Sequence, residues 1–169
     1  MIRLIYSTTE SGYIGRDGKL IHRIAEDMAR FKLLTQDSIV IMGRKTYEEI
    51  PLNFRPLSNR INVVLSRNEE YHQPGCIVFS SLKQAIKNLT IKYPNKDIYI
   101  AGGEAIFKEG LEHASEIYST VIDSNEKGDA KAPMINPTIF RQAYTSESKT
   151  FYDKDRNPIR FKFVNYRRT

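Results

Sequence analysis

The sequence has a single cysteine, Cys76, no tryptophan and no long apolar run. One cysteine cannot form an internal disulfide, so the chain fits a reducing compartment and we expect it in the cytoplasm. Its dense apolar segments, such as Ile39 to Met42, are far shorter than the roughly 20 residues that cross a bilayer. The first residues also lack the basic start and the extended apolar stretch of a signal peptide. We therefore expect neither a membrane protein nor a secreted one.

Several well-known catalytic and ligand-binding motifs are also missing. There is no Gly-Lys-Ser/Thr of a Walker loop and no G-x-S-x-G nucleophile elbow. The glycines after the first predicted strand do not match the G-x-G-x-x-G of a Rossmann fingerprint. The three histidines, His22, His72 and His113, are far apart in the sequence and have no cysteine partners. We therefore expect no metal site.

The composition is that of one folded domain with an excess of basic residues. The 169 residues are 40% apolar and 27% charged, and a chain of this length buries roughly 70% of its unfolded surface without a disulfide or a metal. We expect a single domain over residues 1–169. The net charge of +6 is concentrated in residues 149–169, which alternate in a way typical of a strand with one solvated basic face. The aromatic residues form no RNA-binding motif, so no nucleic-acid partner is expected.

Short β-branched segments alternate with helical patterns along the chain. Strands are predicted at Ile2 to Thr8, Ser38 to Met42, Arg60 to Leu65, Cys76 to Phe79, Asp97 to Ala101, Glu116 to Asp123, Lys149 to Tyr152 and Ile159 to Tyr166. Helices are predicted around Asp27 to Leu34, Tyr47 to Glu49 and Leu82 to Leu89, with Ser80 or Ser81 as the N-cap of the last, and after Gly103. The turn-rich segments 12–19 and 125–136 are expected to be loops that close over a cleft.

The alternation of strands and helices predicts the fold class. Crossover connections of this kind produce a mainly parallel sheet that is covered on both faces. The last two strands, joined through residues 153–158, are expected to form a hairpin. The predicted fold is therefore a three-layer α/β/α sandwich with a mixed, mainly parallel central sheet and an antiparallel C-terminal hairpin.

Two strand-to-helix turns are rich in glycine and suit a phosphate. Gly43-Arg44-Lys45-Thr46 follows one apolar strand, and Gly102-Gly103 follows another. A helix start presents free N–H groups and partial positive charge, and glycines permit close approach of a ligand. Taken singly, each turn fits an ordinary surface helix start equally well. Together they favour a long ligand that carries several phosphates.

Asp27 lies on the same predicted helical face as Phe31 and Leu34. Burying a carboxylate is costly unless it meets a cation or a hydrogen-bond donor, and burial raises its proton affinity. Such a carboxylate suits a site that binds or protonates a basic heterocycle. Asp27 fits equally well as a simple charge at a helix start, as does the neighbouring Glu26.

In their order and spacing, seven segments make the chain resemble the dihydrofolate reductase family. They are Ile14-Gly15, Asp27-x-x-x-Phe31-Lys32, Ile41 to Tyr47, Arg60 to Arg67, Gly102 to Phe107, Tyr118 to Asp123 and Gly128-Asp129. The resemblance runs from Ile2 to about Pro133. It implies reduction of dihydrofolate to tetrahydrofolate by NADPH, with hydride transfer to C6 and a proton delivered to N5. It also implies binding of antifolates such as methotrexate, and we expect a monomer.

The resemblance implies the following substrate site. Asp27 would bind the 2-amino group and N3 of the pterin, and Thr120 would support it, so these two are the implied catalytic residues. Arg60 would grip the glutamate α-carboxylate of the substrate, with Lys32 as a weaker charge at the rim. The other implied substrate contacts are Ile5, Phe31, Ile50 and Leu57.

The resemblance also implies an NADPH site. Arg44, Lys45 and Thr46 would meet its phosphates, while Ser66 and Arg67 would meet the 2′-phosphate that distinguishes NADPH from NADH. The further implied cofactor contacts are Ser7, Ile14, Gly15, Leu20, Gly43, Ala101, Gly102, Gly103, Glu104, Ala105, Ile106 and Phe107. The Gly102-Gly103 peptide would be cis, and residues 15–24 would form a lid that excludes water.

The chain departs from the family pattern in its lid. Leu20-Ile21-His22 stands where the family has Leu-Pro-Trp, Ala101 replaces a larger β-branched residue, and Ala130 replaces a threonine. His22 either replaces the missing indole as a donor or faces solvent. These changes leave the binding residues intact and predict slower turnover if they loosen the placement of the rings. Two alternatives are a non-catalytic module with the same fold and a riboflavin-precursor reductase of the same superfamily.

Overall fold

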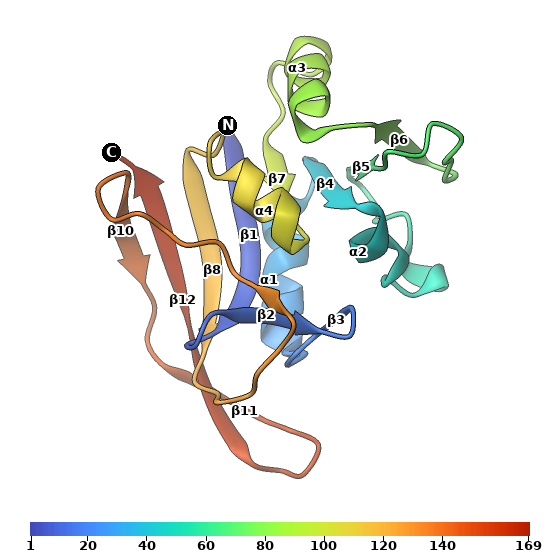
Figure 1. Cartoon of the computed structure of the whole chain (residues 1–169). Helices are drawn as coiled ribbons and strands as arrows, with labels where there is room; N and C mark the ends of the chain where they lie inside the picture. The colour runs from blue at the N-terminus through green and yellow to red at the C-terminus, as the bar shows by residue number, and fades with distance from the viewer.

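A single large mixed sheet organises the protein (Figure 1). The computed structural model describes residues 1–169. The strands are β1 (Ile2–Thr9), β4 (Ile39–Gly43), β5 (Ile61–Leu65), β6 (Cys76–Phe79), β7 (Ile98–Ile100), β8 (Glu116–Ile122), β10 (Phe140–Thr145), β11 (Lys149–Tyr152) and β12 (Pro158–Arg168). Their order is β10-β12-β8-β1-β7-β4-β5-β6, with β11 paired to β12. The predicted strands are confirmed to within two residues at each end, but the sequence did not indicate β10.

The sheet is parallel in its middle and antiparallel at its C-terminal side. β1 pairs in parallel with β7 and β8, and β4 pairs in parallel with β5 and β7. β12 runs antiparallel to β8, β10 and β11, which confirms the predicted hairpin and extends it. The basic face expected for β12 is solvated at Arg160 and Lys162 only. Val164 is buried and Tyr166 packs against the main core, because β10 and the chain before it cover that end.

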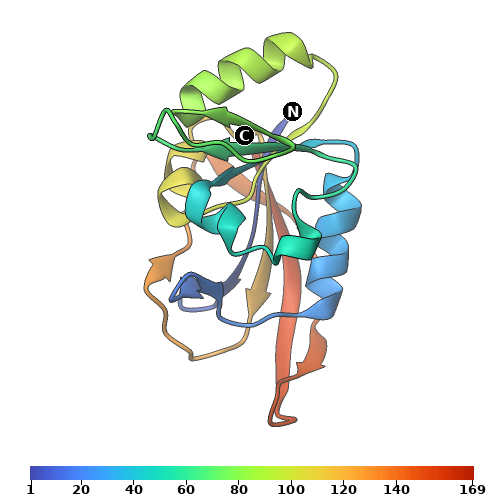
Figure 2. The same cartoon turned by 90° about the vertical axis from the view of Figure 1, so that its right-hand side faces the viewer.

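Helices cover both faces of the sheet, which confirms the three-layer arrangement. They are α1 (Ala25–Thr35), α2 (Arg44–Glu48), α3 (Leu82–Lys92) and α4 (Glu104–Gly110). Figure 2 shows α1 and α4 on opposite sides of the strands. Ser81 caps α3 as predicted, since its Oγ accepts a hydrogen bond from the Gln84 amide at 3.1 Å. None of these helices is long and apolar enough to cross a membrane.

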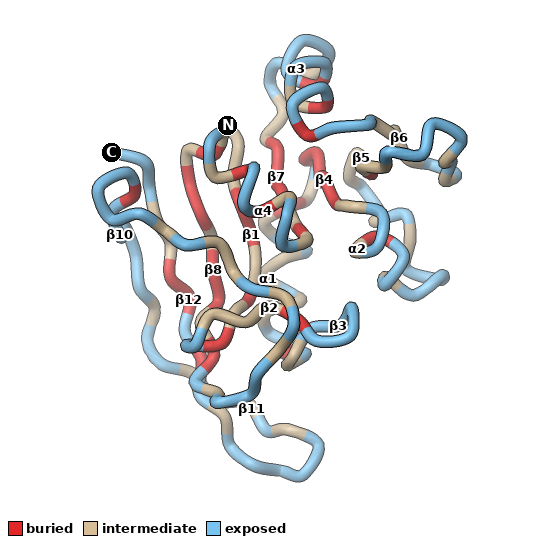
Figure 3. The backbone as a smooth tube through the Cα atoms, in the orientation of Figure 1, coloured by how far each residue is buried: buried red, intermediate tan, exposed pale blue.

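The core follows from strands that are apolar on both faces, and buried residues concentrate on the central strands (Figure 3). Ile39 and Ile41 pack on the side of α3 and α4, whereas Val40 and Met42 pack on the side of α2, against Tyr47. This alternation is the two-residue period of a strand, and burial on both faces is typical of parallel sheets.

The two segments expected to be loops form a second, small sheet in part. Its strands are β2 (Tyr13–Arg16), β3 (Lys19–Leu20) and β9 (Ala130–Lys131), in the order β3-β2-β9. The loop prediction is wrong for these residues. The strands are short and the segments rich in turn residues, so no apolar alternation marks them in the sequence. In Figure 1 this sheet crosses the carboxyl end of β1.

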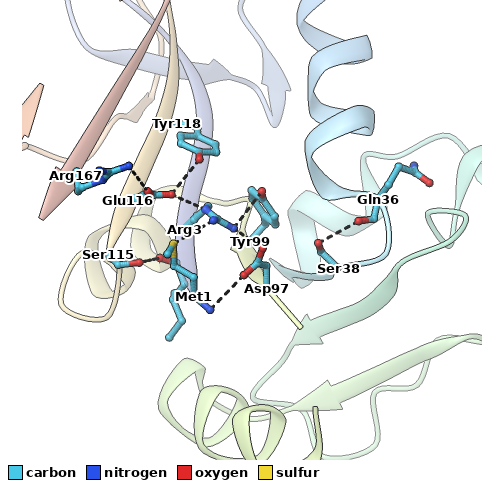
Figure 4. A network of polar contacts seen from close by, with 11 residues as sticks. Met1, Arg3, Gln36, Ser38, Asp97, Tyr99, Ser115, Glu116, Tyr118 and Arg167 are labelled. Carbon is cyan, nitrogen blue, oxygen red and sulfur yellow. Dashed lines mark hydrogen bonds and ion pairs between the residues drawn. The ribbon is translucent and has the colours of Figure 1, made fainter. Parts of the chain in front are cut away.

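A polar network ties the strands together near their other end (Figure 4). Arg3 on β1 forms ion pairs of 2.7 Å with both Asp97 and Glu116. Glu116 on β8 also accepts a hydrogen bond from the Tyr118 hydroxyl at 3.0 Å and pairs with Arg167 of β12 at 3.4 Å. The network therefore links β1, β7, β8 and β12 at the end of the sheet opposite to the small sheet.

Candidate functional site

A cavity of about 530 Å³ opens where β4, β5 and β7 end and where α2 and α4 begin. Its lining residues are Gly43, Arg44, Lys45, Thr46, Leu65, Ser66, Arg67, Asn68, Gly103, Glu104, Ala105 and Ile106. Ligands of open parallel sheets bind in this position, at the carboxyl ends of the strands. The cavity brings together the two glycine turns predicted from the sequence and the Ser66-Arg67 pair.

The glycines let the two turns approach each other closely. The Gly43 amide donates to the Gly102 carbonyl at 2.8 Å, and a Cβ at position 43 would lie only 2.8 Å from Cδ1 of Ile106. Gly102 has a φ of +123°, which favours glycine, and the Gly102-Gly103 peptide is cis as the resemblance implied. Neither α2 nor α4 has a side-chain cap at its N-terminus. The first-turn amides therefore remain available to a ligand.

The charges at the cavity suit a ligand that carries phosphates. Arg44, Lys45 and Arg67 are exposed cations on its wall. The carboxylate of Glu104 is not free, because it accepts a hydrogen bond from the Lys131 amide in β9. Three cations, free amides and glycines without side chains fit a phosphate-bearing dinucleotide such as NADPH.

Some cavity residues were not predicted, and seven predicted cofactor contacts do not line the cavity, namely Ser7, Ile14, Gly15, Leu20, Ala101, Gly102 and Phe107. The sequence analysis missed Leu65 and Asn68, although both are direct neighbours of the predicted Ser66-Arg67 pair. Phe107 instead packs in the core, with its ring edge on Tyr6 at a centroid distance of 5.2 Å. It supports Gly102 from the core side, where a Cβ would lie 3.3 Å from the Phe107 ring.

Asp27 of α1 meets Thr120 of β8. The Thr120 hydroxyl donates to Oδ1 of Asp27 at 2.5 Å, and Thr120 itself is 1% exposed. Burial raises the pKa of the Asp27 carboxyl above its usual range, while the Thr120 hydrogen bond and the charge of Arg30 act in the opposite direction. The carboxylate that the sequence placed on an inward helical face therefore has a donor and a cation as partners.

The elements around Asp27 bring an apolar wall to the same face of the sheet. On β1, Ser7 is the register partner of Thr120 and Ile5 is the partner of Tyr118, so both lie on the same face of the sheet as Thr120. Phe31 of α1 packs with Ile50 and Leu57 on the apolar cluster of Val40, Met42, Tyr47 and Val64. A half-buried carboxylate beside apolar and aromatic side chains can bind a flat, polar-edged ring.

Arg60 lies near the other end of α1. Its Nη1 donates to the Thr35 hydroxyl at 3.1 Å and its Nε to the Ser58 carbonyl at 2.8 Å. Burial lowers the pKa of its guanidinium. Thr35 is fully buried, and its hydroxyl in turn donates to the Phe31 carbonyl at 2.7 Å. The sequence did not indicate this support. The hydrogen bonds of Arg60 to the protein use Nε and Nη1 and leave Nη2 free. Lys32 is exposed on α1.

Comparisons with known proteins show the family to which the chain belongs. A family model for dihydrofolate reductase matches residues 1–168. The chain belongs to the dihydrofolate reductase family. It is 37% identical over 141 residues to the dihydrofolate reductase of Mycobacterium leprae, which covers 82% of this chain and 84% of that protein. It is 32% identical over 166 residues to that of Bacillus subtilis, covering 98% of this chain and 94% of the relative.

A solved structure supports the same conclusion for the fold. The dihydrofolate reductase of Enterococcus faecalis, complexed with NADP(H) and RAB-propyl, superimposes with a TM-score of 0.82 at 28% identity. The match covers 100% of this chain and 96% of that one. The dihydrofolate reductase fold predicted from the sequence is confirmed.

Residues 15–24, the segment that the resemblance implies to be a lid, are held at their start against the connection between β8 and β9. The Asp129 amide donates to the Gly15 carbonyl at 3.0 Å, and the Asp17 amide donates to Oδ2 of Asp129 at 3.0 Å. A Cβ at Gly128 would lie 2.1 Å from the Gly15 oxygen, so this contact requires glycine there. Ile14 is half-buried against the main core, and Leu20 is 46% exposed. The small sheet therefore fixes the lid residues near the end of β1.

The His22 side chain lies between the segment expected to form the lid and the C-terminal hairpin. Its Nε2 lies 2.8 Å from the Ser124 hydroxyl, and its ring edge packs on Phe151 of β11 at a centroid distance of 5.8 Å. The side chain is half-buried, and burial lowers its pKa. His22 thus attaches this dihydrofolate reductase lid to the C-terminal hairpin.

Proposed function

We propose that this protein is an NADPH-dependent dihydrofolate reductase. One observation carries the proposal: the Asp27 carboxylate accepts a 2.5 Å hydrogen bond from Thr120 next to an apolar wall, on the same sheet that ends in the cationic cavity. Bound NADPH supplies the hydride that reduces C6 of dihydrofolate, while N5 gains a proton. The protein contributes binding, orientation and electrostatics.

The substrate site consists of one anion, one cation and the wall between them. The Asp27 carboxylate accepts hydrogen bonds from the 2-amino group and N3 of the pterin and favours its protonated form, with water as the proton carrier. Thr120 orients the carboxylate. Arg60 binds the α-carboxylate of the glutamate through the nitrogen that the protein leaves free, with Lys32 at the rim. The wall residues are Ile5, Phe31, Ile50 and Leu57.

The cofactor site uses the cavity and the lid. Arg44, Lys45 and Thr46 bind phosphate oxygens together with the first-turn amides of α2 and α4. Ser66 and Arg67 bind the 2′-phosphate, which selects NADPH over NADH. The backbone of the glycine pair lies along the pyrophosphate. Contacts to the nicotinamide and its ribose come from Ser7, Ile14, Gly15, Leu20 and Ala101.

A spectrophotometric assay tests this function. The purified protein is expected to oxidise NADPH only when dihydrofolate is present, and methotrexate is expected to stop the reaction. Tight binding of NADPH and methotrexate without turnover would instead select a non-catalytic module. We also propose that residues 1–169 form a single domain, because one continuous sheet connects both halves of the chain. We further propose a cytoplasmic monomer, and light scattering after size exclusion tests the oligomeric state.

A further inference from the structure

Arg30 is a half-buried cation one turn along α1 from Asp27, and the sequence analysis gave it no role. The centre of its guanidinium lies 4.2 Å from the centroid of the Phe163 ring on β12. Its Nη2 donates to Oδ1 of Asn165 at 2.9 Å, also on β12. Two contacts to neighbouring positions of one strand therefore hold the charge in a defined place.

The strand register places this charge beside the Asp27 carboxylate. Thr120 of β8, which donates to Asp27, is the register partner of Phe163, over which Arg30 lies. Residues three apart on a helix are neighbours on its surface. Asp27 and Arg30 thus project from one face of α1 onto one adjacent pair of strand residues, and each attracts the other electrostatically.

We propose that Arg30 is a positioning residue that supplies a fixed positive charge to the Asp27 site and thereby sets the pH range in which the site works. This inference rests on the proposed function of Asp27. A neighbouring cation stabilises the ionised form of the Asp27 carboxyl. It therefore lowers the affinity of this carboxyl for a proton that it shares with the bound pterin. Guanidinium remains charged at every pH at which the enzyme folds, so the effect is constant.

The other groups around Asp27 do not replace this charge. Glu26 on α1 acts in the opposite direction, and it is paired with Lys149 of β11 at 3.3 Å. On β8, Thr120 donates its hydroxyl and Tyr118 is uncharged, because burial raises the pKa of its phenol. The tyrosines that face Arg30 from other strands are Tyr99 of β7 and Tyr144 of β10.

Arg30 also differs from the cations of the polar network. The Tyr118 ring lies between Arg30 and Arg3, whose guanidinium centres are 5.8 Å and 5.7 Å from its centroid. Arg3 is neutralised by Asp97 and Glu116 (Figure 4). Arg30 forms no ion pair of that kind, because its hydrogen-bond acceptor is the neutral amide of Asn165. No ion pair neutralises the charge of Arg30, so this charge acts on the Asp27 carboxylate.

Three variants separate the charge of Arg30 from its packing. Arg30→Met keeps the aliphatic length without the charge. Arg30→Gln is neutral but can still donate to Asn165, and it serves if the methionine variant does not fold. Arg30→Lys restores a cation. Arg141→Met removes an exposed cation at the far end of β10 and serves as the matched control.

Two readouts are measured on the full chain. The Asp27 carboxyl is titrated by ¹³C NMR, with Asp27→Asn to assign its signal, and kcat with saturating NADPH and dihydrofolate is measured from pH 5 to 9. Both midpoints are expected to rise in the neutral variants by about one pH unit, which is the lower end of the effect of a nearby opposite charge on a carboxylate. Arg30→Lys should remain near the parent value, and Arg141→Met should equal it.

An unchanged midpoint in either readout for a folded neutral variant would overturn the inference and reduce Arg30 to a packing residue. A rise of similar size in Arg141→Met would also overturn it, since the effect would then come from net charge. Failure of the proposed function is a different result, namely no oxidation of NADPH with dihydrofolate at any pH. The NMR titration does not depend on turnover, so it still tests the effect of Arg30 on Asp27.

Discussion

Replacement of Asp27 by asparagine removes one charge and almost no volume. The Thr120 hydroxyl can donate to the amide oxygen as it does to Oδ1 of the carboxylate, so the local packing is preserved. What is lost is the attraction between an anion and the protonated pterin. Asp27→Asn therefore tests the electrostatic role of the carboxylate separately from its shape.

The size of the effect follows from the two hydrogen bonds that the carboxylate makes to the ring. Bonds to a charged partner contribute about 1.5 to 3 kcal/mol each, against about 1 kcal/mol for neutral ones. Losing the charge in both bonds removes roughly 1 to 4 kcal/mol, which corresponds to roughly a 5- to 900-fold loss of rate. We expect this loss at pH 7 and above. At pH 5 the loss should be much smaller, because solvent then protonates more of the substrate.

The assay is NADPH oxidation with saturating dihydrofolate from pH 5 to 8. Thermal unfolding at pH 7 is the control. Because burial raises the pKa of Asp27, the ionised carboxylate destabilises the native state at pH values above that raised pKa. The asparagine variant should therefore be at least as stable as the parent at pH 7. An equal loss of rate at pH 5 and pH 8 would refute the role given to this carboxylate.

Three further predictions concern the cofactor, the substrate and the lid. Arg67→Ala should raise the KM for NADPH roughly 10- to 100-fold, because a charge-assisted contact of about 1.5 to 3 kcal/mol is lost. The KM for NADH should remain nearly unchanged. Arg60→Lys should raise the KM for dihydrofolate about tenfold, because an ammonium lacks the planar fork and the fixed geometry that Thr35 provides. His22 has a lowered pKa, so it binds its proton less readily in the folded state and the protein loses stability as the pH falls below about 6.5. His22→Phe, which can still pack on Phe151, should show a smaller drop of Tm between pH 7 and pH 5; an identical drop in both proteins would contradict this role.

The candidate site was predictable where local chemistry restricts the residue type. Gly43 and Gly102 stand where two turns nearly touch, and no other residue fits there without displacing a neighbour. For Asp27 the local pattern left a buried site residue and a simple helix-start charge equally open, and the resemblance to the family decided between them. These are properties of short segments, and they survive in the sequence as residue identities at fixed spacings.

Arg30 and Thr35 were not predictable in the same way. On the sequence, Arg30 is an ordinary basic residue in a helix, and its role depends on Phe163 and Asn165, more than 130 positions away. The strand β10 was missed because its residues after Phe140 are exposed and polar, so no apolar alternation marks it.

The sequence by itself determined most strands of the large sheet and the main helices, and its resemblance to the dihydrofolate reductase family implied which residues would meet phosphate and pterin. Those features depend on local propensity, on the helix and strand periods of apolar residues and on the steric freedom of glycine. All three act within a few residues. Only the tertiary structure decided which charges face each other, how Thr35 supports Arg60 and where His22 attaches the lid. Such contacts depend on strand register and on how a helix lies across the strands. Register in turn is set by the packing of the whole sheet.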